Sequence, residues 1–388
     1  MALLNVSDSW IIISATSKLF FLQRKGKDLE TTSHKIIDVT EVSTSLPFVR
    51  TTYELEENVR TNQGEKIEMC CSAISRDGQL FAVAISSKIC LIYSLSSSIE
   101  MKRAFRVPKA PSVITFDPQG EHLIVGDRAG NVTMYGVSEA IFSDDKLDIN
   151  GEKTNFEGIP LTGGITMMLD VAFDEIGRRM ITADRDEKIR ISRYPDSFVI
   201  EAYALGHEEY VKTLAIYKNY VISGGGDCRV HIHDFDTGKT VAVSERLHDK
   251  KPISQLQVVE NNGKLNVWSS LEDDSTLTSI AFDQIFQQAE QVKFDAPLMG
   301  FYVDEKTRQI YGLNTNGLSV HSFDGESHQL AIDSNVLEAI RLAKNPDINY
   351  FKNVTHQNVD EYKKRKAAKF AEVEAKKGKR QQSLASQN

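Results

Sequence analysis

The chain has 388 residues, 41% of them hydrophobic, and is therefore long enough to bury a large core. The net charge is −8, and the four cysteines contain no CxxC pair, which argues against a disulfide framework or a cysteine-based zinc site. No apolar run approaches the roughly 20 residues of a membrane-spanning helix, so we expect a soluble protein with no membrane partner.

Short apolar runs of strand type recur from the N-terminus to about residue 320. The seven runs are Leu19–Leu22, Ile89–Tyr93, Val132–Tyr135, Ile189–Ile191, Val230–Ile232, Leu277–Ile280 and Leu318–Val320. From the second run onward their first residues are 43, 57, 41, 47 and 41 positions apart, close to the period of about 40–45 residues of a four-stranded propeller blade. A second apolar strand precedes five of the runs, at 80–85, 122–125, 179–182, 220–223 and 309–313.

This repeat predicts an all-β fold, a seven-bladed WD-repeat β-propeller over residues 1–334. Two polar stretches, at about 23–63 and 138–160, interrupt the period and are interpreted as surface insertions. Residues 335–388 are expected to form a helical, basic and partly disordered extension, because 336–342 has helical spacing and 361–380 contains nine Lys or Arg against three Glu.

The best-formed repeat runs from Gly206 to Asp234. A standard WD repeat opens with Gly-His, continues with Ser and a turn Asp, and closes with Trp-Asp. In this chain the equivalent residues of the polar network are His207, Ser223, Asp227 and, in the place of the Trp, His233. We predict that these four residues form a hydrogen-bonded structural network.

His231 and His233 share one face of a strand, which raises the question of a metal site. No third ligand is near them in the sequence, so we interpret the pair as structural and expect no metal. The sequence also lacks a phosphate-binding loop, a GxSxG elbow and an HExxH motif. We therefore expect no catalytic residues and no cofactor on this chain. The alternative from a different functional class is a propeller enzyme with a metal ion in its central channel.

One segment is more specific than the repeat itself. It comprises Leu169-Asp-Val-Ala172, Ile181-Thr-Ala-Asp-Arg-Asp-Glu-Lys-Ile-Arg-Ile-Ser192 and Leu205-Gly-His-Glu-Glu-Tyr-Val211. This segment closely resembles the non-catalytic WD-repeat subunit of the eukaryotic tRNA (guanine-N(7)-)-methyltransferase. The resemblance implies a nuclear heterodimer in which a separate catalytic subunit binds S-adenosylmethionine and forms 7-methylguanosine in the tRNA variable loop, while this chain stabilises that subunit.

The same resemblance implies that Arg185, Glu187, Lys188 and Arg190 contact the catalytic partner, with Arg190 as the main candidate for an ion pair between the subunits. The alternative for this charged string is a lattice of ion pairs within the chain. A generic WD-repeat adaptor, such as a ubiquitin-ligase substrate receptor or a ribosome-assembly factor, is the alternative function. Candidates for tRNA phosphate contacts lie in the basic tail: Lys363, Lys364, Arg365, Lys366 and Lys369.

Overall fold

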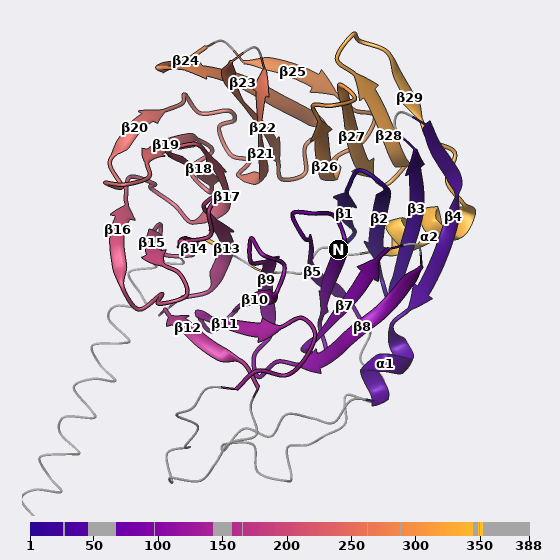
Figure 1. Cartoon of the computed structure of the whole chain (residues 1–388). Coiled ribbons are helices and arrows are strands. Elements are labelled where there is room, and N and C mark those ends of the chain that lie inside the picture. Colours follow the sequence, from indigo (N-terminus) through magenta and orange to yellow (C-terminus); the bar gives the residue numbers. More distant parts are fainter. Residues whose placement is uncertain are drawn as a thin grey trace, which may run out of the picture. The chain divides into compact units, whose positions relative to one another are not determined.

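The computed structural model describes residues 1–25, 28–45, 67–96, 98–142, 157–164, 166–261, 263–287, 289–343, 348, 350 and 351. The chain divides into two units, Met1–Ile348 and Asn349–Asn388. The first unit contains seven antiparallel sheets, each formed by consecutive strands, arranged in a ring (Figure 1). The prediction of an all-β, seven-bladed propeller is confirmed.

The first four blades contain the following strands. They are β1 (Leu3–Val6), β2 (Trp10–Ala15), β3 (Lys18–Lys25) and β4 (Asp28–Asp38); β5 (Met69–Ile74), β6 (Leu80–Ile85), β7 (Ile89–Leu95) and β8 (Ile99–Arg106); β9 (Pro111–Phe116), β10 (His122–Asp127), β11 (Asn131–Gly136) and β12 (Ile159–Gly163); and β13 (Met168–Phe173), β14 (Arg179–Asp184), β15 (Ile189–Arg193) and β16 (Ile200–Ala204).

The last three blades complete the ring. They contain β17 (Val211–Tyr217), β18 (Tyr220–Gly225), β19 (Val230–Asp234) and β20 (Thr240–Val243); β21 (Ile253–Asn261), β22 (Lys264–Leu271), β23 (Thr276–Asp283), β24 (Ile285–Phe286) and β25 (Glu290–Lys293); and β26 (Leu298–Asp304), β27 (Gln309–Asn314), β28 (Gly317–Ser322) and β29 (Ser327–Gln329). Two helices are described, α1 (Thr40–Ser45) and α2 (Ser334–Leu342).

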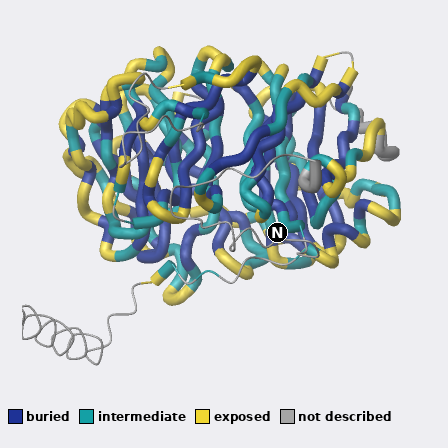
Figure 2. Tube along the Cα trace, turned by 90° about the horizontal axis from the view of Figure 1, so that it is seen from below, coloured by how far each residue is buried: buried dark blue, intermediate teal, exposed yellow. Residues whose placement is uncertain are grey.

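All seven predicted apolar runs are third strands of blades, and the five preceding runs are second strands. These strands are apolar on both sides because a propeller buries both faces of each sheet. On β2, for example, Ile11 and Ile13 pack toward the last blade while Ile12 packs toward the second blade. Each of the seven hydrophobic clusters lies between two consecutive blades, and Figure 2 shows the buried positions concentrated along the strands.

The two segments interpreted as insertions are described only in part. The first contains the end of β3, strand β4 and helix α1, while residues 46–66 lie outside the described part. The second contains the start of β12, whereas residues 143–156 lie outside it. Both β4 and β12 are outermost strands, which pair along one edge only.

The ring closes where the first blade meets the last. The guanidinium of Arg24 forms a buried ion pair with Asp304 and also donates to the carbonyl of Ser7 at 3.0 Å. Helix α2 covers the same joint, and its residues Val336 and Ile340 are fully buried in the cluster shared by these two blades. In the described part of the chain no helix is long and apolar enough to cross a membrane.

Candidate functional site

The charged string Ala183–Arg190 forms the hairpin between β14 and β15 of the fourth blade. Asp184 is buried at the base of the turn, where its Oδ1 accepts the backbone N–H groups of Asp186 at 2.8 Å and Lys188 at 3.3 Å. Burial raises the pKa of Asp184, against the opposing effect of these two donors. Glu187 occupies the left-handed region with φ of 68°. Asp184 therefore shapes the turn through these two backbone hydrogen bonds.

The turn carries three of the four predicted partner-binding residues. Lys188 is exposed, whereas Arg185 and Glu187 are half-buried. Glu187 also lies close enough to His207 of the next blade to raise that imidazole's pKa, although burial has the larger, lowering effect. The hairpin and the Gly206-His207 loop, which are separate in the sequence, are thus neighbours in the fold.

Arg190 stands apart from the turn, on β15, where it pairs with Thr182 and Tyr203 in the adjacent strands. Its Nη1 donates to the hydroxyl of Thr162 on β12 at 2.6 Å, and its guanidinium carbon lies 6.0 Å from the centre of the Tyr203 ring. The half-buried Arg190 forms no ion pair with any residue that the structure describes. The Arg190 guanidinium therefore keeps its capacity to bind a carboxylate from another chain.

Exposed apolar side chains occur on the outer strands and adjoining loops of the fourth and fifth blades, and one of them, Tyr203, lies next to Arg190. We define the outer patch by its residues Phe198, Val199, Ile200, Tyr203, Leu205, Val241 and Val243, which are 40% to 75% exposed. The two blades meet within it, because the Thr240 hydroxyl donates to the carbonyl of Leu205 at 3.1 Å. Apolar residues gathered in this way on an outer surface mark an interaction site more often than chance.

The predictions made from the sequence do not include the outer patch. Its signal in the sequence is that five of the six residues from Ile200 to Leu205 are apolar or aromatic, in a stretch where an outermost strand needs few apolar residues.

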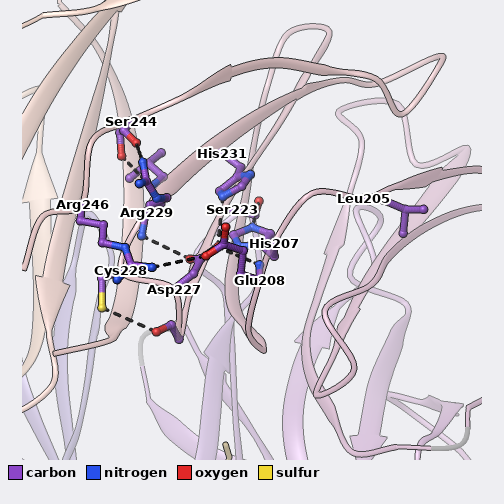
Figure 3. A network of polar contacts seen from close by, with 12 residues as sticks. Leu205, His207, Glu208, Ser223, Asp227, Cys228, Arg229, His231, Ser244 and Arg246 are labelled. Carbon is purple, nitrogen blue, oxygen red and sulfur yellow. Dashed lines mark hydrogen bonds and ion pairs between the residues drawn. The ribbon is translucent and has the colours of Figure 1, made fainter. Parts of the chain in front are cut away.

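A second polar site lies in the fifth blade and contains the predicted structural network (Figure 3). Nδ1 of His207 lies 2.8 Å from Asp227 Oδ2, and Nε2 of the same ring lies 2.8 Å from Ser223 Oγ. The network is completed by His231, whose Nε2 lies 3.1 Å from the same Asp227 oxygen. His233 is adjacent, but its Nδ1 hydrogen-bonds to Thr240 at 3.3 Å instead.

The Asp227 carboxylate carries the negative charge of this network. Burial alone would raise the pKa of the Asp227 carboxyl, but hydrogen bonds from His207 and His231 outweigh burial and hold that pKa well below its usual range. Burial lowers the pKa of His207, and it lowers that of His233 to about 3. The cluster therefore combines an ionised Asp227 carboxylate with neutral imidazoles at His207 and His233 at neutral pH.

The expectation that no third ligand lies near His231 and His233 is wrong. One ring nitrogen from each of His207, His231 and His233 lies within 4.8 Å of the others, and all three residues are buried. The sequence hides this arrangement, because His207 belongs to the loop that precedes β17 and comes to lie over β19 only when the blade folds. The candidate tRNA-contact residues Lys363, Lys364, Arg365, Lys366 and Lys369 lie outside the described residues.

Comparison with known proteins adds to this geometry. A family model described as the tRNA methyltransferase TRM82 WD40 domain matches residues 143–373. The chain is 34% identical over 278 residues to a tRNA (guanine-N(7)-)-methyltransferase non-catalytic subunit of Caenorhabditis elegans, over 70% of this chain and 66% of that protein. It is 35% identical over 178 residues to the TRM82 subunit of Kluyveromyces lactis, over 43% of this chain and 38% of that one.

A Xenopus laevis relative with the same description is 29% identical over 177 residues, which cover 45% of this chain and 41% of the relative. The matched part thus spans 38% to 66% of the length of these three relatives. Among solved structures, a chain from a crystal structure of the mitotic checkpoint complex superimposes with a TM-score of 0.60 at 13% identity, over 81% of this chain and 88% of that one. That likeness concerns the fold alone.

Proposed function

Because the chain belongs to the family of tRNA methyltransferase TRM82 WD40 domains, we propose that it is the non-catalytic subunit of a heterodimeric tRNA (guanine-N(7)-)-methyltransferase. In this proposal the chain binds and stabilises a separate catalytic subunit, which binds S-adenosylmethionine and forms 7-methylguanosine in the tRNA variable loop. This chain itself then needs neither a catalytic residue nor a cofactor. The proposal also places the complex in the nucleus, on the strength of the basic tail.

The observation that carries the proposal is the setting of Arg190. Its guanidinium has a hydroxyl and an aromatic ring as neighbours but no carboxylate from the described part of the chain, and it borders the outer patch. A planar guanidinium binds a carboxylate through two parallel hydrogen bonds, and surrounding apolar contacts exclude water from that pair. We propose that the catalytic subunit supplies the carboxylate and a matching apolar surface.

Arg185, Glu187 and Lys188 have a secondary place in this interface. They lie on the turn at one end of the hairpin that carries Arg190, so a partner covering the hairpin contacts both. Charged residues at the rim of an interface affect the association rate and specificity more than the affinity. We therefore expect substitutions on the turn to weaken the complex less than substitution of Arg190.

The experiment is co-expression of this chain with its catalytic subunit, followed by purification through a tag on this chain and assay of tRNA guanine-N7 methylation. Arg190→Glu is expected to lose the partner and the methylation together. Arg308→Glu is the control, because Arg308 also lies near an aromatic ring, that of Phe323 at 5.2 Å, but in the last blade, where it pairs with Asp324 at 3.6 Å. Recovery of ubiquitin-ligase or ribosome-assembly components without a methyltransferase would overturn the proposal.

The basic tail is proposed to contact the tRNA backbone. Residues 361–380 carry a local charge of +6 on an otherwise acidic chain, and phosphate contacts require Lys and Arg. Such contacts add affinity without reading the base sequence. Deletion of residues 361–388 should lower both the tRNA affinity of the complex and its salt dependence, and unchanged values of both would refute the contact.

A further inference from the structure

A threonine of the third blade holds the guanidinium of Arg190. Nη1 of Arg190 donates to Oγ1 of Thr162 at 2.6 Å, across the boundary between β15 of the fourth blade and β12 of the third. Thr162 is only 6% exposed, so its hydroxyl has little access to water and depends on the protein for its hydrogen bonds. This hydrogen bond therefore fixes one end of a long side chain that is otherwise only half-buried.

The ring of Tyr203 limits the guanidinium from a second side. Tyr203 lies directly opposite Arg190 where β15 pairs with β16, and side chains paired in this way lie on the same face of a sheet. The centre of the Tyr203 ring lies 6.0 Å from the guanidinium carbon. The hydroxyl and the ring together restrict both the position and the plane of the guanidinium.

The hydrogen bond to Thr162 also determines which donors of Arg190 stay available. A guanidinium can bind a carboxylate through two parallel hydrogen bonds, either from its two Nη atoms or from Nε and one Nη. Thr162 engages Nη1, whereas Nε and Nη2 form no hydrogen bond within the described part of the chain. The edge formed by Nε and Nη2 is thus available to both oxygens of one carboxylate.

We propose that Thr162 is a positioning residue of the interface with the catalytic subunit, because it orients Arg190 so that the Nε–Nη2 edge binds a Glu or Asp carboxylate of that partner. This inference rests on the proposed function, and it adds a residue of the third blade to an interface otherwise formed by the fourth and fifth. Ordering a flexible side chain during association reduces affinity, and arginine has many rotamers to lose. Thr162 orders Arg190 before the partner arrives, so the complex forms with higher affinity.

The test is a double-mutant cycle on the full chain, with the Kd for the catalytic subunit measured by calorimetric titration. Thr162→Val replaces the hydroxyl by a methyl group and should raise the Kd about 3- to 10-fold, as expected when one ordered side chain becomes free. Thr162→Ser keeps the hydroxyl and should restore binding. Thr213→Val is the matched control, because Thr213 is 7% exposed and its hydroxyl also accepts a hydrogen bond across a blade boundary, from the backbone N–H of Leu256 at 3.3 Å. It should leave the Kd unchanged.

The second half of the cycle separates positioning from a general loss of stability. In an Arg190→Met background, Thr162→Val should have no further effect on the Kd, because no guanidinium is left to orient. An equal effect of Thr162→Val in both backgrounds would overturn the proposal, as would a wild-type Kd for the folded single variant. The proposed function fails separately, if Arg190→Glu itself binds the catalytic subunit with the wild-type Kd.

Arg190→Lys covers the case in which Thr162→Val fails to fold. Lysine keeps the positive charge, but its ammonium group lacks the planar fork that binds Thr162 and both carboxylate oxygens at once. The Kd of Arg190→Lys should therefore rise about tenfold or more. A wild-type Kd for this variant would show that binding does not need an oriented guanidinium, and would overturn the proposal.

Discussion

Replacement of Arg190 by glutamate tests the proposed interface most directly, because the structure allows its effects on folding and on binding to be separated. Among the residues that the structure describes, Arg190 makes one hydrogen bond, to Thr162, and one distant ring contact, to Tyr203. At a half-buried position these contacts contribute about 1–2 kcal/mol to folding. The hydrophobic clusters on both sides of the blade do not include Arg190, so Arg190→Glu should fold.

The expected effect on binding is larger. Loss of one partner from a desolvated charge pair costs about 2–5 kcal/mol, which corresponds to a roughly 30- to several-thousand-fold rise in the Kd of the heterodimer. Arg190→Glu also places a carboxylate opposite the partner's carboxylate, so the effect should exceed that of Arg190→Met. Calorimetric titration of the purified subunits measures the Kd, and circular dichroism during heating checks that the variant is folded.

A charge-swap experiment tests whether Arg190 pairs with one particular carboxylate of the catalytic subunit. If a glutamate or aspartate of the catalytic subunit binds Arg190, its replacement by arginine should restore binding to Arg190→Glu while weakening binding to the wild-type chain. A folded Arg190→Glu protein whose Kd changes less than threefold would refute the reasoning, because the outer patch would then bind without the ion pair. Arg308→Glu should leave the Kd unchanged.

Three further predictions concern stability. Arg24→Met should destabilise the ring closure by about 3–5 kcal/mol in urea unfolding, because it leaves Asp304 buried without its cation, and a loss below 1 kcal/mol would contradict this. Ile340→Ala should cost about 2–5 kcal/mol if α2 seals the joint as its burial indicates, and an unchanged midpoint would show that it does not. Burial lowers the pKa of His233 to about 3, below its unfolded value of about 6.5, so this contribution to stability is present above pH 6.5 and is lost as the pH falls toward 3. Between pH 7 and pH 4 the wild type should therefore lose on the order of 3 kcal/mol more than His233→Phe, whereas parallel pH profiles would contradict the shift.

The sequence predicts the two middle strands of a blade better than its innermost and outermost strands. Third strands such as 89–93 are continuous apolar runs because both of their faces pack against neighbouring blades. Outermost strands pair along one edge and face solvent. The residues of β20 are therefore as exposed as those of a loop, although they form a strand. For the same reason β4 and the start of β12 fall in stretches whose sequence resembles insertions.

The polar network shows a different limit. The repeat pattern correctly brings His207, Ser223 and Asp227 to one blade, but it assigns the Trp position to His233 and leaves His231 without a role. Strand pairing explains the difference, since Ser223 lies directly opposite His231 on the neighbouring strand. Alternation along the strand places both histidines on the same face, and which of them reaches Asp227 depends on the loop that positions the carboxylate.

The histidine cluster and Arg190 both connect to the outer patch, but they lie on different sides of the fourth blade. Thr240 joins them on one side, because its hydroxyl bonds to the ring of His233 and to the carbonyl of Leu205, whose side chain lies apart from His207 and His231 in Figure 3. Arg190 points to the other side, toward Thr162 of the third blade. Contacts without shared partners contribute nearly additively to stability. The histidine cluster is thus linked to the outer patch through Thr240 and Leu205, whereas the position of Arg190 depends on its contact with Thr162 of the third blade.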